Sequence, residues 1–121
     1  MRIFKQSDFE EWAEDESLSD EVLKKAISEL ERGLIDASLG AGLYKKRIAR
    51  AGQGKSGGYR TLIAFKEGDR AIFVYGFPKN EKENISVVDK ERFKKLARFY
   101  FGLRDESIAK LLKQKTLVEI L

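Results

Sequence analysis

The chain has 121 residues, of which 42% are hydrophobic and 11% aromatic, enough for one compact core but not for two. Cysteine and histidine are absent, which excludes disulfides, thiolate metal sites and His-dependent nucleophiles, so any catalysis must use Lys, Arg, Tyr or carboxylates. No signal-peptide pattern and no membrane-length apolar run is present. We therefore expect a single domain over residues 1–121, soluble and cytoplasmic.

The formal charge of +4 is distributed unevenly. Residues 1–43 carry five basic and eleven acidic side chains, whereas residues 44–66 carry seven basic side chains and no acidic one. A short stretch of this kind forms an electrostatic footprint for a polyanion. We interpret the basic segment as one that binds RNA.

The N-terminal third reads as one strand followed by two helices. A short strand is expected over Met1–Lys5, and the capping-box spacing of Ser7 and Glu10 predicts a short acidic helix after it. A clearer amphipathic helix follows, with Ser19 as its N-cap and Gly33 at its end.

The middle of the chain changes to extended segments. Leu43–Ile48, Tyr59–Lys66 and Ala71–Phe77 read as strands, and the tight turn at residues 67–69 predicts that the last two form an antiparallel hairpin. The four glycines of Gly52–Gly58 indicate a mobile loop.

The last third reads as two helices and a final strand. Asp89 is expected to cap a helix that stops at Gly102, and a shorter helix over Glu106–Gln114 precedes an extended Leu117–Leu121. The resulting order, β-α-α-β-β-β-α-α-β, predicts an α+β fold without linkers or internal repeats.

The first candidate site lies in the basic strand of residues 44–50. Alternation along a strand sends Lys45 and Arg47 to one face and Lys46 to the other, with Arg50 at the end. The alternative interpretation is a solvated edge strand whose lysines discourage aggregation.

The second candidate is the glycine-rich segment with Lys55. It contains Gly-Lys-Ser but is no P-loop, because Ala49 stands where a P-loop needs glycine and a strand follows instead of a helix. Such a segment can still wrap a phosphate, although an ordinary connection would look the same.

The third and fourth candidates lie on the next two strands. Arg60 shares a face of its strand with Leu62 and Ala64, whereas Tyr59 points to the other face. An arginine there can donate two parallel hydrogen bonds to a phosphate. The alternative is an ion pair between Arg60 and a helix carboxylate. The polar segment after Phe77 adds Lys79, Asn80 and Lys82 at a strand end, where a simple turn is the alternative.

Together these segments resemble the RelE/HigB toxins of type II toxin–antitoxin systems. The resemblance rests on Tyr44-Lys45-Lys46-Arg47-Ile48-Ala49, on Gly54-Lys55-Ser56-Gly57-Gly58-Tyr59-Arg60, and on Tyr75-Gly76-Phe77-Pro78-Lys79-Asn80-Glu81-Lys82-Glu83-Asn84-Ile85, with matching spacing between them. It implies a RelE-like fold: a small antiparallel sheet with the N-terminal helices on one face and a C-terminal helical segment.

The resemblance also implies a function, namely an mRNA interferase that cuts messenger RNA in the ribosomal A site and so inhibits translation. In this family the RNA's own 2′-hydroxyl attacks the adjacent phosphate, so neither a metal nor another cofactor is expected. A cognate antitoxin encoded nearby is the implied protein partner, and no membrane is involved.

The candidate residues follow from this comparison. Catalytic roles are expected for Lys55 as base or phosphate clamp, Arg60 as transition-state stabiliser, and Lys79. RNA contacts are expected from the remaining basic, aromatic and amide side chains of these segments: Lys45, Lys46, Arg47, Arg50, Tyr59, Asn80 and Lys82.

Two other classes of function remain open. A ParE-like toxin of similar fold would inhibit DNA gyrase and cut no RNA. A non-catalytic RNA-binding module would display aromatics for base stacking, for which Tyr59, Phe65 and Phe73 are available, although they alternate as core residues do. Tyr100 could also stack on a base, but its helical spacing favours the core.

Overall fold

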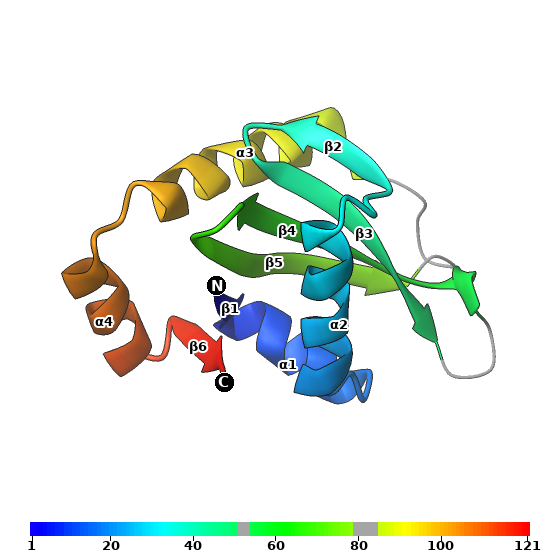
Figure 1. Ribbon diagram of the computed structural model, residues 1–121, viewed down its shortest axis with the longest axis horizontal. Helices are drawn as coiled ribbons and strands as arrows, with labels where there is room; N and C mark the ends of the chain where they lie inside the picture. Colours follow the sequence, from blue (N-terminus) through cyan, green and yellow to red (C-terminus); the bar gives the residue numbers. More distant parts are fainter. Residues whose placement is uncertain (51–53, 79–84) are drawn as a thin grey trace.

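The structure is a computed structural model that describes residues 1–50, 54–78 and 85–121, without the side chains of residues 54–57. The described residues form four helices and one six-stranded sheet of order β2-β3-β4-β5-β1-β6 (Figure 1). In chain order the elements are β1 (Arg2–Gln6), α1 (Ser7–Asp15), α2 (Asp20–Glu31), β2 (Ala37–Gly40), β3 (Leu43–Arg50), β4 (Gly54–Lys66), β5 (Arg70–Pro78), α3 (Val87–Phe101), α4 (Asp105–Lys113) and β6 (Leu117–Ile120).

The sheet is antiparallel except for one pair of strands. β2 to β5 run as an antiparallel series, β6 is antiparallel to β1, and β1 pairs with β5 in parallel. A parallel pair needs a long connection, and here the two N-terminal helices and three strands lie between its members in sequence. The expected α+β class is thus confirmed, with one parallel pair that the sequence did not predict.

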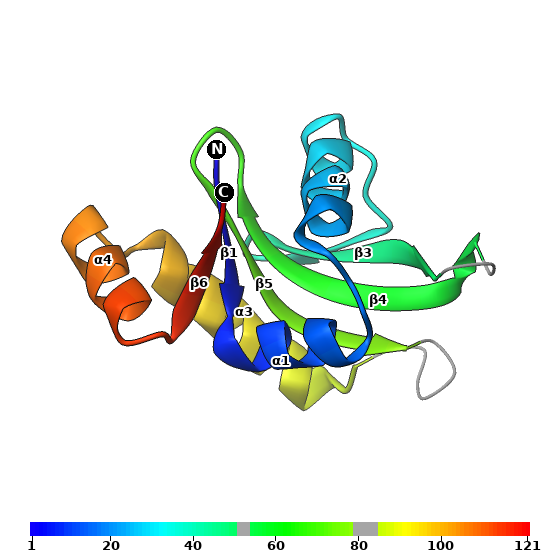
Figure 2. The same cartoon turned by 90° about the horizontal axis from the view of Figure 1, so that it is seen from below.

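Helices cover both faces of the sheet. α1 and α2 pack their apolar stripes on one face, where residues such as Phe9, Leu23 and Ile27 meet Phe73. α3 packs on the opposite face, where Ala97 and Tyr100 join Leu43, Leu62 and Ile72 in a second core. Figure 2 shows α2 and α3 on opposite sides of the curved sheet. The N-terminal helices share one face as expected.

Two of the described helices, α2 and α3, begin at serine caps. Ser19 begins α2 as expected, because its hydroxyl accepts a hydrogen bond from the backbone amide of Val22 at 3.3 Å. The capping box at Ser7 was a wrong expectation, because Ser7 is already helical and the N-cap Gln6 makes no side-chain cap. α3 is capped by Ser86, which accepts from the amide of Asp89 at 3.1 Å, so it begins before the expected cap.

Two strand assignments also differ from expectation. β2 was not predicted, because its four residues carry no alternating pattern. Residues 54–58 were expected in a mobile loop, but β4 begins at Gly54, which pairs with Arg50 across an irregularity in β3. The tight turn before β5 is confirmed, with Gly68 at a φ of 74°.

The C-terminal segment is part of the sheet. β6 pairs with β1, and the guanidinium of Arg2 donates two hydrogen bonds, of 2.9 and 3.0 Å, to the Glu119 carboxylate. Arg70 donates to the carbonyls of Tyr100 and Leu103 at the end of α3, which anchors that helix to β5. Among the described residues, no helix is both long and apolar enough to span a membrane.

Candidate nucleic-acid interface

Two neighbouring strands, β3 and β4, place the candidate cations side by side on the α3 face of the sheet. In the register of β3, β4 and β5, Lys45 lies opposite Leu62, and Arg47 lies opposite Arg60, which in turn lies opposite Phe77. Directly paired residues of antiparallel strands point to the same face. We call Lys45, Arg47 and Arg60 the basic face; it begins where the apolar core under α3 ends.

The Arg47–Arg60 pair is unusual for a structural contact. Like charges directly opposite on a sheet destabilise it, with Cβ atoms typically about 4.5–5.5 Å apart. The positive charge of Arg47 is partly neutralised by Asp36, whose Oδ1 lies 3.4 Å from the Arg47 Nε. Arg60 is only 7% exposed and lies directly opposite Arg47 in the sheet. Such crowding of cations is suited to a bound anion.

α3 adds a cation that sequence reasoning missed. Lys90 lies in the first turns of the helix and, together with Lys45, lines a pocket of about 160 Å³ at the edge of the basic face. The direction of a helical side chain depends on the position of the N-cap. Because the sequence placed that cap at Asp89 instead of Ser86, it gave no means to assign Lys90 to this face.

Lys46 lies outside the interface, contrary to the expectation that it contacts RNA. Its side chain points to the α2 face and is 4% exposed, and its Nζ lies 2.7 Å from the Glu29 carboxylate of α2. A carboxylate on a helix thus neutralises a lysine of the basic strand. We remove Lys46 from the candidate RNA-binding residues.

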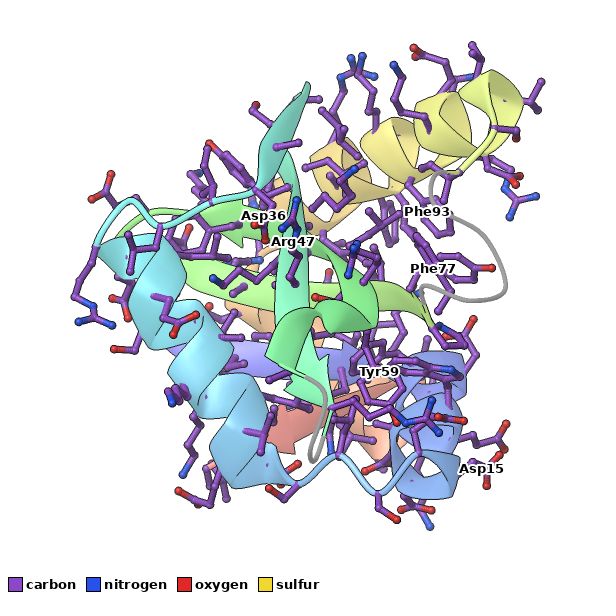
Figure 3. All side chains as sticks on the ribbon, turned by 90° about the vertical axis from the view of Figure 1, so that its right-hand side faces the viewer. Asp15, Asp36, Arg47, Tyr59, Phe77 and Phe93 are labelled. Carbon is purple, nitrogen blue, oxygen red and sulfur yellow. The ribbon has the colours of Figure 1, made fainter. Side chains whose placement is uncertain are left out.

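Tyr59 and Arg50 also lie on the face opposite Arg60. Tyr59 is 4% exposed and packs edge-on against Trp12, with ring centroids 5.4 Å apart. Arg50 lies over the Tyr59 ring at 5.5 Å. Burial and a hydrogen bond to Glu16 raise the pKa of Tyr59, while Arg50 opposes that rise. Figure 3 shows Tyr59 toward α1 and Phe77 toward Phe93 of α3. Tyr59 and Arg50 therefore form a cluster that is separate from the basic face.

The other expected site residues lie outside what the structure describes. The backbone of Lys55 belongs to β4, but its side chain is outside the described part of the molecule. Lys79, Asn80 and Lys82 lie between the described ranges 54–78 and 85–121. Their direction relative to the basic face is therefore part of the proposal below.

Tyr100 belongs to the core, as its spacing indicated. It is 2% exposed, and its hydroxyl donates a hydrogen bond to the Gln6 side chain. Burial, with a contribution from Asp8, raises the pKa of Tyr100 to about 12. Within the described ranges, no three carboxylates gather closely enough to hold a metal ion.

Comparison with known proteins agrees with this architecture. A search among curated proteins gave no match. A family model described as "RelE toxin of RelE / RelB toxin-antitoxin system" matches residues 1–120. Membership implies a toxin of a toxin–antitoxin system with a cognate antitoxin as its partner. The chain therefore belongs to the RelE toxin family.

Proposed function

We propose that the protein is a HigB-like mRNA endoribonuclease that cleaves RNA on the basic face without a metal or other cofactor. The observation that carries this proposal is the Arg47–Arg60 pair, two arginines directly opposite one another on β3 and β4 at the end of the α3 core. A guanidinium binds a phosphate through two parallel hydrogen bonds, so two of them can hold one phosphodiester from two sides.

The proposed reaction uses the RNA itself as nucleophile. A base removes the proton of a 2′-hydroxyl, the 2′-oxygen forms a bond to the adjacent phosphorus, and the bond from phosphorus to the 5′-oxygen breaks. An acid protonates the leaving 5′-oxygen. The products are a 2′,3′-cyclic phosphate and a 5′-hydroxyl end, so the protein supplies only position, charge and proton transfer.

Arg60 is the proposed transition-state stabiliser. It is 7% exposed, and a charge held in place away from water acts on developing negative charge more strongly than a solvated one. Lys55 and Lys79 are the proposed partners in proton transfer or phosphate binding, because they flank Arg60 and Phe77 in sequence on β4 and after β5. Asn80 and Lys82 are proposed to contact the RNA beside them.

The proposed setting is messenger RNA in the ribosomal A site, with inhibition of translation as the result. The antitoxin is proposed to neutralise the basic face by covering Lys45, Arg47, Lys55 and Arg60 with acidic side chains, or to displace the helix around Leu111. The non-catalytic alternative is less well supported, because Tyr59 and Phe73, which would stack on bases, lie in the core beneath α1 and α2. The ParE-like alternative, inhibition of DNA gyrase without RNA cleavage, is distinguished from this proposal by the experiment described next.

The proposal is tested by inducing the protein in cells and measuring which process stops first and which variants still arrest growth. Induced wild-type protein should stop incorporation of labelled amino acids before it stops DNA synthesis, whereas a gyrase inhibitor would stop DNA synthesis first. Arg60→Ala should abolish the arrest and Arg60→Lys should not restore it, because an ammonium lacks the forked geometry. Arg32→Ala, at the exposed end of α2, is the control and should remain toxic. Full toxicity of a folded Arg60→Ala protein would exclude Arg60 from the site.

A further inference from the structure

A pocket beside the basic face has a composition that the proposed phosphate chemistry does not explain. It holds about 160 Å³, the space of about five water molecules at ~30 Å³ each. Its described lining residues come from five elements and the segment before α3: Leu39, Lys45, Leu62, Phe77, Ile85 and Lys90. β2 contacts α3 there, as Figure 1 shows.

The pocket is apolar inside and cationic at its border. Leu62 and Phe77 are almost fully buried and form its base, and the partly exposed Leu39 and Ile85 form its sides. The charged residues among the described lining are both lysines, Lys45 and Lys90. An occupant that combines a flat apolar group with neighbouring negative charge complements this arrangement, and an RNA nucleotide has that combination.

The pocket also has the right position relative to Arg60. Leu62 follows Arg60 by two residues on the same face of β4, and Lys45 precedes Arg47 by two on β3. Two residues of strand span about 6.6–6.8 Å, a step comparable with that between successive phosphates of a single strand. A strand of RNA with one phosphate at the arginine pair would therefore bring a neighbouring base over the pocket.

We infer that this pocket accepts one nucleobase of the bound RNA, and that Lys45 and Lys90 supply positive charge to the RNA backbone beside that base. The inference rests on the proposed function, because it places the base next to the phosphate held by Arg47 and Arg60. It makes Leu39 and Ile85 specificity-determining residues, since they set the width of the pocket, and it gives Lys90 a role in RNA binding.

Binding of uncleavable oligonucleotides tests the inference. In 2′-deoxy oligonucleotides, which lack the nucleophile, one base at a time is replaced by an abasic site. For the wild type, affinity should fall about tenfold at one position, because stacking of a base is worth about 1–3 kcal/mol. Leu39→Trp and Ile85→Trp fill the pocket and should each bind the intact and abasic strands equally. Leu34→Trp, at a residue that is 51% exposed and outside the pocket, should behave as the wild type does.

Two controls complete the design. Lys90→Ala should weaken binding of the intact strand severalfold more than Lys95→Ala, an exposed residue of the same helix that does not line the pocket. Circular dichroism establishes that each variant is folded. Equal affinity of the wild type for every abasic strand, or unchanged base dependence in both tryptophan variants, would overturn the inference, as would occupation of the pocket by an acidic peptide and not by the oligonucleotide.

The outcome is separable from that of the proposed function. RNA cleavage without dependence on any one base would contradict the base-binding role of the pocket and still support the nuclease. Base-dependent binding without cleavage of messenger RNA on ribosomes would support the base-binding pocket and contradict the nuclease.

Discussion

Lys45, Lys46 and Arg47 show how alternation along one strand separates neighbouring cations into two environments. Lys45 and Arg47 lie on the α3 face, whereas Lys46 is buried against Glu29 of α2. The sequence predicted which residues share a face, because the period of a strand is two. It could not predict that a carboxylate of α2 covers Lys46, because that depends on how a helix packs across the sheet.

The buried Lys46–Glu29 pair should be important for stability. Lys46→Ala should lower the free energy of unfolding by about 3–5 kcal/mol, since it leaves the Glu29 carboxylate without this partner in a buried site. Lys24→Ala is the matched control: its Nζ lies 3.6 Å from the Glu21 carboxylate, which is 83% exposed. Exposed pairs contribute roughly 0–1 kcal/mol. Urea denaturation measures both, and equal losses would contradict the burial argument.

β3 and β4 approach one another closely where β3 is irregular. Gly58 lies there, and a Cβ on Gly58 would be 2.2 Å from the Ile48 carbonyl oxygen and 2.8 Å from the Arg50 nitrogen. This explains one glycine of the segment that the sequence indicated to be a mobile loop. Glycine content cannot distinguish a loop from a strand that needs close backbone approach.

Gly58→Ala should therefore separate β3 from β4 locally. We expect it to destabilise the protein by about 1–3 kcal/mol, the usual cost of overpacking, and to increase amide hydrogen exchange around Ile48. Gly102→Ala is the control, because a Cβ there meets its nearest neighbours at 3.6 and 3.7 Å. A fully stable Gly58→Ala protein would show that the two strands can move apart without cost.

α3 is joined to the junction of β1 and α1 by the Tyr100–Gln6 hydrogen bond. Because burial raises the pKa of Tyr100 from 10.0 to about 12, the folded state holds this proton more tightly than the unfolded state does. The resulting stability is fully present below pH 10 and is lost as the pH rises toward 12.

Tyr100→Phe should remove the part of the stability loss at alkaline pH that comes from ionisation of Tyr100. Between pH 10 and 12 the free energy of unfolding of the wild type should fall more steeply than that of Tyr100→Phe, by up to about 1.4 kcal/mol per pH unit. Denaturation in urea at several pH values measures the difference, and it cancels the titration of lysines common to both proteins. Parallel curves would mean that the hydroxyl titrates normally.

The molecule as a whole divides its charge between two sides of the sheet. Acidic residues are concentrated in the N-terminal segment that forms α1 and α2, whereas the basic face lies on the α3 side with Lys90. The sequence predicted this footprint and most of the strands and helices. The sequence could not predict which cations lie together in the folded protein. That depends on the register of β3 with β4 and on the start of α3, which are tertiary properties.

Binding to RNA or ribosomes should consequently depend on salt. Each phosphate contact releases counterions, so affinity should fall steeply between about 50 and 200 mM salt. Arg47→Ala should reduce the slope of log affinity against log salt, whereas Lys113→Ala, an exposed cation of α4, should not. Binding that is insensitive to salt would rule out an electrostatic interface.

The chemistry of RNA ends in cells tests the central claim most directly. Messenger RNA is isolated shortly after induction of the wild type, Arg60→Ala and Arg32→Ala, and new 5′ ends are mapped with ligation schemes that distinguish 5′-hydroxyl from 5′-phosphate. The account predicts new 5′-hydroxyl ends within coding regions for the wild type and Arg32→Ala, and none for Arg60→Ala. Growth arrest by the wild type without such ends, or the same ends from a folded Arg60→Ala protein, would contradict it.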